Sequence, residues 1–194
     1  MKKIPMLYER DYCNYTSRGY GDNDFTFKSK KPIAGMEWVE EGKGVATIKY
    51  DGSCCAIIAG RLYKRYDAGI KGRKVPDGAI PCQEKADPTT KHFPCWVACS
   101  RDNKADKYFY EAYDLKEDWE DGTYELVGPK VQRNMYNLPN HQLWKHGKDI
   151  IEVGRDFESI KKYLENHEIE GIVFWLDGEP KCKIRRKDFG FRWK

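Results

Sequence analysis

Hydrophobic and polar positions alternate along residues 45–50, a pattern typical of a β-strand with one buried face. The Asp-Gly pair at 51–52 is a common turn signal and would end this strand shortly after Lys49. Apolar runs at 54–58 and 61–66 predict two further short strands. The three strands would form a compact antiparallel meander, with Lys49 at its first corner.

Further along the chain the pattern predicts one helix and two more strands. Residues 156–167 carry apolar side chains at helical spacing after Asp156, which suits an N-cap. Residues 108–113 and 123–127 are rich in aromatic and β-branched side chains and predict strands.

A β-hairpin is predicted at residues 171–185, because Asp177-Gly178 is a favoured two-residue turn between two strand-like runs. If Leu176 pairs with Glu179, counting back along both strands predicts three further pairs. These pairs are Phe174 with Lys181, Ile172 with Lys183, and Glu170 with Arg185. One carboxylate and three cations would then line the same surface.

Length and composition fit one folded domain. The chain has 194 residues, of which 40% are hydrophobic and 34% charged, and one hydrophobic core can serve up to roughly 250 residues. We therefore expect a single domain over residues 1–194. Residues 1–35 show no sustained period and predict a loop-rich N-terminal segment, whereas 67–105 predict a long excursion over the surface.

Charge, apolar runs and cysteines narrow the class of protein. The net charge of +4 permits a nucleic-acid partner without requiring one. No apolar run approaches the ~20 residues of a membrane span, so we expect no membrane partner and a cytoplasmic location. The 7 cysteines lack C-x-x-C spacing and fit reduced thiols. Zinc could in principle be surrounded by Cys82, Cys95, Cys99 and His92. Their spacing matches no common zinc module, so ordinary thiols are favoured.

Charged residues recur along the chain in an order that is more informative than any one of them. Lys49-Tyr50-Asp51-Gly52 alone is weak evidence, because the same residues describe an exposed lysine before an ordinary turn. Further positions follow it: Arg65, Glu125 in Tyr-Glu-Leu-Val-Gly, Glu170 in Glu-Gly-Ile-Val, and Lys183 with Arg185 in Lys-Cys-Lys-Ile-Arg-Arg.

In this order the motifs resemble those of the covalent nucleotidyltransferase superfamily of DNA ligases, RNA ligases and mRNA-capping guanylyltransferases. The resemblance spans residues 45–186, and the residues around the motifs are similar to those of small ATP-dependent RNA ligases related to the vertebrate 5′-to-3′ RNA-repair ligase. It implies an α+β fold, namely an ATP-grasp-like ligase adenylation domain in which antiparallel sheets flank a nucleotide cleft and helices are few.

The resemblance implies an ATP-dependent RNA ligase that requires Mg²⁺ or Mn²⁺. Lys49 would attack the α-phosphate of ATP, AMP would pass to a 5′-phosphate RNA end, and a 3′-hydroxyl RNA end would displace the AMP. Because a free lysine has a pKa of about 10.4, it is protonated at neutral pH, and neighbouring cations must favour the neutral amine.

Single residues also receive roles from the resemblance. Lys49 would be the catalytic nucleophile, and Glu170 would bind the metal. The nucleotide would be held by Ile48, Asp51, Arg65, Glu125, Lys183 and Arg185. Three alternatives stay open: Asp51 as a turn former, Glu125 as a surface residue, and Glu170 as a salt-bridge partner of Arg185. Five further aromatic or histidine residues are interpreted as core residues: Trp38, Trp96, Trp144, His141 and His146.

Two features depart from the family pattern. Arg185 stands where a second lysine is usual, and only nine residues follow it, so we expect no C-terminal oligonucleotide-binding (OB) domain. That expectation argues against a capping enzyme. The alternatives are a DNA nick ligase, a nucleotidyltransferase that uses GTP, and a non-catalytic relative that binds nucleic acid.

Overall fold

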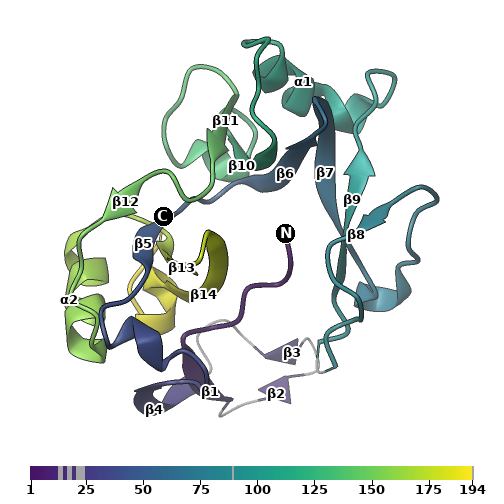
Figure 1. Ribbon diagram of the computed structural model, residues 1–194. Helices are drawn as coiled ribbons and strands as arrows, with labels where there is room; N and C mark the ends of the chain where they lie inside the picture. Colours follow the sequence, from purple (N-terminus) through teal and green to yellow (C-terminus); the bar gives the residue numbers. More distant parts are fainter. Residues whose placement is uncertain (13–14, 17–18, 21–24, 89, 194) are drawn as a thin grey trace. The chain divides into compact units, whose positions relative to one another are not determined.

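The computed structural model describes residues 1–12, 15–16, 19–20, 25–88 and 90–193 (Figure 1). The chain divides into two compact units: unit 1 comprises Met1–Lys3 and Asp51–His146, and unit 2 comprises Ile4–Tyr50 and Gly147–Lys194. Both units consist of antiparallel sheets with few helices, which confirms the α+β class. The expectation of a single domain over residues 1–194 stays a prediction.

Unit 1 is built on a six-stranded antiparallel sheet in the order β11-β10-β6-β7-β9-β8. Its strands are β6 (Ser53–Ile58), β7 (Arg61–Ala68), β8 (Ile80–Pro81), β9 (Phe93–Ala98), β10 (Gly122–Val127) and β11 (Gln142–Lys145). Its helix α1 (Lys107–Tyr113) contributes Phe109 and Ala112 to a core shared with one face of the sheet. Short 3-10 turns occur at η2 (Ile70–Gly72), η3 (Lys104–Asp106) and η4 (Gln132–Asn134).

Unit 2 is built on a four-stranded antiparallel sheet in the order β12-β5-β13-β14. Its strands are β5 (Val45–Lys49), β12 (Ile150–Ile151), β13 (Gly171–Leu176) and β14 (Glu179–Arg185). Helix α2 (Phe157–Asn166) packs its apolar side on one face of this sheet. The remaining elements are the pairs β1 (Tyr8–Tyr12) with β4 (Phe25–Pro32) and β2 (Tyr15–Thr16) with β3 (Gly19–Tyr20), and the turns η1 (Glu37–Val39) and η5 (Arg186–Phe189).

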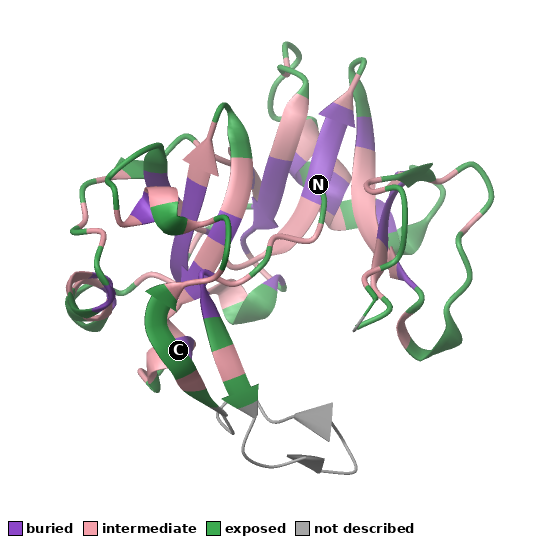
Figure 2. Ribbon diagram, turned by 60° about the horizontal axis from the view of Figure 1, so that its bottom comes forward, coloured by how far each residue is buried: buried purple, intermediate pink, exposed green. Residues whose placement is uncertain are grey.

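Burial follows the strands in both units. Figure 2 shows buried residues concentrated along the strands and exposed residues along the loops. In unit 2, Ile172, Phe174 and Ile184 are 0% exposed and contact α2 in one core. Because successive side chains of a strand point to opposite faces, the other face of each sheet is left for polar and charged side chains.

The predicted helix at 156–167 is confirmed as α2. The Asp156 side chain accepts a hydrogen bond of 3.0 Å from the Ser159 amide, as an N-cap does. Phe157, Ile160 and Leu164 are buried on one side of the helix. The strand at 123–127 is also confirmed, as β10.

Residues 108–113 form a helix, so the predicted strand is wrong. Phe109 and Ala112 are three positions apart and both buried, a spacing that places them on one side of a helix and on opposite faces of a strand. The aromatic content of the segment favoured a strand, but packing against the sheet of unit 1 determines the structure.

The predicted meander is wrong at its first strand. β6 and β7 form the expected hairpin, whereas β5 pairs with β12 and β13 in the sheet of unit 2. The Lys-Tyr-Asp-Gly segment is therefore a crossing from one sheet to another. Gly52 is needed there because a Cβ atom would lie 2.2 Å from the Leu126 carbonyl oxygen of β10.

The hairpin at 171–185 is confirmed, but its register is not the predicted one. Leu176 pairs with Glu179 as expected, and an irregularity between Phe174 and Trp175 then shifts the pairing by one residue. The predicted pairs of Phe174 with Lys181, Ile172 with Lys183 and Glu170 with Arg185 are therefore wrong. The observed pairs are Phe174 with Cys182, Val173 with Lys183, Ile172 with Ile184, and Gly171 with Arg185.

Two segments predicted to be irregular contain sheet structure. Residues 1–35 include β1 and β4, which pair with each other, so this segment is not mainly loop. Within 67–105, strand β9 returns the chain to the sheet of unit 1 by pairing with β7.

No helix among the described residues is long and apolar enough to cross a membrane.

Candidate functional site

Lys49 is the last residue of β5, and the register of the sheet defines its neighbours. It pairs with Gly171 of β13, which pairs in turn with Arg185 of β14. Lys183 lies two residues before Arg185 on the same strand. Because cross-strand partners and residues two apart project to the same face, Lys49, Lys183 and Arg185 share the face opposite the core of unit 2.

Gly171, the glycine of the Glu-Gly-Ile-Val motif, lies between Lys49 and Arg185 in this row. A Cβ atom on Gly171 would lie 2.3 Å from the Ile184 carbonyl oxygen and 2.8 Å from the Arg185 Cα. A side chain at this position would therefore push β14 away from β13. The glycine keeps the strands close where their charged residues meet.

Lys49 and Glu170 form an ion pair at the end of β5. The two side chains are 23% and 12% exposed, so water screens the pair less than it would on an open surface. The Glu170 carbonyl accepts a 2.8 Å hydrogen bond from the Arg186 amide, which fixes the backbone that carries the carboxylate. The structure thus brings together the predicted nucleophile and the predicted metal ligand.

Arg185 is held by a buried carboxylate. Its Nη2 and Nε atoms donate to Asp188 Oδ1 at 2.8 and 3.1 Å, and its amide donates to Asp188 Oδ2 at 2.8 Å. Arg10 of β1 lies 3.2 Å from the same carboxylate, whose side chain is 0% exposed. Asp188 therefore orients two guanidinium groups, and it was not identified from the sequence.

Lys183 has its backbone fixed by residues 5–7, which run along one edge of β14. Its amide donates to the Pro5 carbonyl at 3.0 Å, and its carbonyl accepts from the Leu7 amide at 2.8 Å. Ile48, predicted to contact the nucleotide, pairs with Ile172 on the core face. The structure therefore does not bring the Ile48 side chain together with Lys49.

A second charged face belongs to unit 1. Glu125 of β10 pairs with Cys54 of β6 on one side and with Trp144 of β11 on the other. Cys55 and Lys64 pair on the core face, so their neighbours Cys54 and Arg65 lie on the same face as Glu125. Arg65 Nη2 and Nε lie 3.0 and 3.1 Å from Asp67 Oδ1. Asp51 also belongs to unit 1, and its amide donates to the Tyr136 hydroxyl at 2.7 Å.

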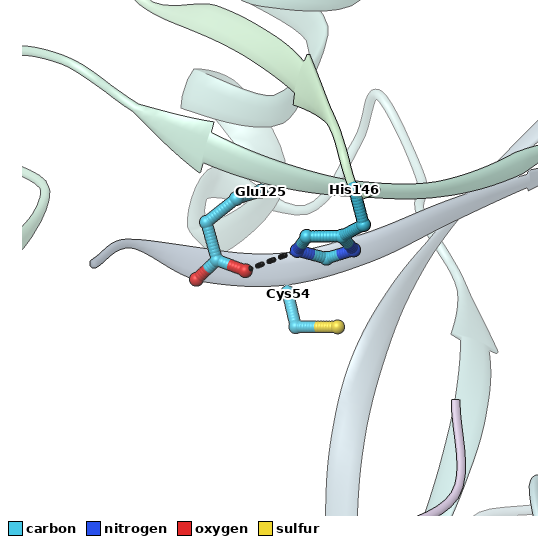
Figure 3. A group of neighbouring side chains, drawn as sticks. All are labelled: Cys54, Glu125 and His146. Carbon is cyan, nitrogen blue, oxygen red and sulfur yellow. Dashed lines mark hydrogen bonds and ion pairs between the residues drawn. The ribbon is translucent and has the colours of Figure 1, made fainter. Parts of the chain in front are cut away.

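Glu125 is tied to a histidine on this face. His146 Nε2 lies 2.8 Å from Glu125 Oε2, and His146 Nδ1 lies 3.0 Å from the Thr123 hydroxyl (Figure 3). The Cys54 thiol is the third member of this group. Burial, and secondly the Glu125 carboxylate, raise the pKa of the Cys54 thiol to about 12.

No protein-family model matches this sequence, and no curated protein matches it. The site must therefore be judged from its own geometry. Unit 2 brings together Lys49, Glu170, Lys183 and Arg185, and unit 1 brings together Arg65, Glu125 and His146 with Cys54.

The interpretation of five residues as core side chains is correct for three of them: His141, Trp96, which is 6% exposed, and Trp38, which packs against the core of unit 2. His141 is 6% exposed, and its Nδ1 lies 2.7 Å from Glu111. Trp144 and His146 lie instead on the charged face of unit 1, half-buried, so for them the prediction is wrong. The pairing of β10 with β11 places Trp144 beside Glu125, and His146, which follows β11, reaches Glu125 through its Nε2 atom.

Proposed function

We propose that this protein is an ATP-dependent RNA ligase that carries AMP on Lys49. The observation that supports this most is the row of charges in unit 2, where Lys49 at the end of β5 contacts Glu170 and shares a sheet face with Lys183 and Arg185. A nucleophilic amine, a carboxylate for a metal ion and two cations for phosphate oxygens are the groups that this reaction needs.

In the first step, the Lys49 amine attacks the α-phosphorus of ATP, a nitrogen–phosphorus bond forms, and pyrophosphate leaves. The amine needs a free lone pair to attack, and in the structure it is held in an ion pair with the Glu170 carboxylate. We therefore expect Glu170 to release Lys49 when the nucleotide binds.

Glu170 also fits a magnesium ion. Magnesium prefers carboxylate oxygen and retains most of its water, so one partly exposed carboxylate beside the nucleophile suffices. A bound Mg²⁺ would supply positive charge to the phosphate oxygens. The Glu170 carboxylate would then exchange Lys49 for the metal ion.

Lys183 and Arg185 would neutralise the phosphate oxygens of ATP and of the RNA 5′ end. Asp188 holds the Arg185 guanidinium in one orientation, which suits recognition of a fixed group of oxygens. In unit 1, Glu125 would accept hydrogen bonds from ribose hydroxyls, and Arg65 would contact the nucleotide. These two roles rest on the motif resemblance.

The same resemblance favours RNA over DNA and ATP over GTP. The second step would move AMP from Lys49 to a 5′-phosphate RNA end, with a phosphate–phosphate bond replacing the lysyl bond. In the third step, a 3′-hydroxyl attacks the activated 5′ phosphate, a phosphodiester forms, and AMP leaves. In each step a nucleophile displaces a leaving group at phosphorus, and no oxidant is required.

A label-transfer experiment tests this proposal. The protein is incubated with Mg²⁺ and ATP or GTP labelled at the α-phosphate, and then with RNA or DNA that has a 5′-phosphate. We expect label on the protein from ATP, its transfer to RNA, and sealing to a 3′-hydroxyl end. Label from GTP alone, or transfer to nicked DNA alone, would replace the proposal by the corresponding alternative, and no label at all would favour a non-catalytic binding protein.

A matched pair of variants tests the role of Glu170. Glu170→Gln removes the charge beside Lys49, and Glu158→Gln removes the charge of an exposed glutamate of α2 that pairs with Lys30. We expect the first variant to lose at least tenfold in AMP transfer and the second to match the wild type. Equal activity of the two variants would show that Glu170 has no part in the reaction.

A further inference from the structure

Three side chains of different ligand chemistry meet on the charged face of unit 1. The Cys54 thiol, the Glu125 carboxylate and the His146 imidazole place one ligand atom each within 4.8 Å of one another. Cys54 and Glu125 are direct cross-strand partners on β6 and β10, and His146 follows β11. In Figure 3 the three side chains gather on the same side of these strands.

We propose that Cys54, Glu125 and His146 form a binding site for a divalent ion of the zinc class. Sulfur and imidazole ligands select borderline-soft ions such as Zn²⁺, with Co²⁺ and Cd²⁺ as substitutes, whereas Mg²⁺ prefers oxygen alone. Three protein ligands leave one position of a tetrahedral ion for water or for another oxygen ligand. This site is distinct from Glu170, which suits magnesium.

The spacing of the ligand atoms fits one ion after small movements. Zinc bonds of about 2.0 to 2.3 Å in a tetrahedron separate neighbouring ligand atoms by roughly 3.3 to 3.6 Å. The distance between His146 Nε2 and Glu125 Oε2 is 2.8 Å and would increase when an ion binds. The widest of the three distances, at most 4.8 Å, would decrease. Side-chain rotations supply such shifts, and the strands that carry Cys54 and Glu125 keep their register.

Thr123 supports the histidine ring in either tautomer. Its hydroxyl lies 3.0 Å from His146 Nδ1 and can donate or accept a hydrogen bond. When Nε2 binds an ion, Nδ1 keeps its proton and donates to this hydroxyl, an arrangement typical of metal-bound histidines. The Cys54 thiol gives up its proton when the sulfur binds the ion, so metal uptake releases protons.

The proposed metal site includes Glu125, which the proposed function assigns to the ribose of ATP. The following consequence rests on that proposed function. If Glu125 holds the ribose of ATP, the ion and the nucleotide compete for the same carboxylate. Zinc would then inhibit AMP transfer to Lys49 even when Mg²⁺ is in excess. A DNA or RNA ligase without a thiol at the position of Cys54 would lack this inhibition.

Titration of the purified protein with Co²⁺ tests the site without any enzymatic assay. A thiolate bound to Co²⁺ gives an intense charge-transfer band in the near ultraviolet. We expect this band, at one ion per chain, in the wild type and in Cys82→Ser, which alters another half-buried cysteine. We expect its loss in Cys54→Ser, and at least tenfold weaker binding in His146→Ala and Glu125→Gln.

Absence of the band in the wild type, or its persistence in Cys54→Ser, would overturn the proposal. Circular dichroism of each variant separates loss of a ligand from loss of the fold, and the three variants alter β6, β10 and the residue that follows β11. Competition between the ion and the nucleotide is measured in a separate experiment, as inhibition of AMP transfer by Zn²⁺ in the wild type and in Cys54→Ser. A metal site in a protein that never accepts AMP would refute the proposed function and leave this site established.

Discussion

Replacement of Asp188 by asparagine should destabilise unit 2 strongly. The Asp188 side chain is 0% exposed and accepts hydrogen bonds from Arg185, while Arg10 lies 3.2 Å away. The two arginine side chains are only 10% and 17% exposed, so water replaces the lost carboxylate poorly. Removal of one partner from a buried ion pair costs about 3 to 5 kcal/mol, and we expect about 3 because asparagine keeps the shape and one acceptor.

The matched control is Asp114→Asn. Arg101 holds Asp114 with two hydrogen bonds of 2.7 and 2.9 Å, but the side chains are 62% and 48% exposed. An exposed pair contributes less than about 1 kcal/mol, so this variant should resemble the wild type. The comparison therefore separates the effect of burial from that of hydrogen-bond geometry.

Urea unfolding followed by tryptophan fluorescence measures both variants. A loss of about 3 kcal/mol corresponds to a melting temperature lower by roughly 6 to 12 °C in a chain of this size. Equal stability of Asp188→Asn and Asp114→Asn would refute the reasoning that burial makes this carboxylate indispensable. Asp188→Asn should also reduce AMP transfer under conditions where it is folded, because Arg185 loses its orientation.

Three further substitutions have expected outcomes. Tyr8→Phe should raise the free energy of unfolding by about 1 kcal/mol, measured by urea unfolding, because the buried hydroxyl has no hydrogen-bond partner among the described residues. Gly171→Ala should lower it by more than about 2 kcal/mol in the same assay, since a Cβ would lie 2.3 Å from the Ile184 carbonyl oxygen; a loss below about 0.5 kcal/mol would contradict this. Burial raises the pKa of the Cys182 thiol to about 12. The neutral thiol therefore contributes fully to the free energy of unfolding below the unfolded pKa of 9.0, and this contribution is lost as the pH rises toward 12. Between these two pH values the free energy of unfolding should fall with pH less steeply in Cys182→Val than in the wild type. The two slopes should differ by about 1.4 kcal/mol per pH unit, and equal slopes would contradict this.

Local signals predicted the elements that depend on local structure. Asp156 caps α2, and the Asp177-Gly178 turn joins β13 to β14, because capping and tight turns involve residues close in the sequence. The one-residue shift near Phe174 was not predicted, since an irregularity in a strand has no reliable local signal. Its consequence is that Arg185 lies opposite Gly171 instead of Glu170.

Pairing between distant segments could not be read from the sequence. The strand that ends at Lys49 looks like the first strand of a meander, yet it pairs with residues more than a hundred positions away. The group of Cys54, Glu125 and His146 depends on the order of β6, β10 and β11 in one sheet. Motif order predicted Lys49 and Glu170 as functional residues, and only the structure shows that they are in contact.

The central claim is that Lys49 accepts AMP, and intact-mass measurement tests it most directly. The wild type, Lys49→Arg and Lys43→Arg are incubated with ATP and Mg²⁺, and the modified residue is located by peptide mapping; Lys43 is an exposed lysine paired with Glu41. We predict a gain of one adenylyl group in the wild type and in Lys43→Arg, located on Lys49, and no gain in Lys49→Arg. An equal gain in Lys49→Arg, or none in the wild type at any pH and with Mn²⁺ in place of Mg²⁺, would contradict the account.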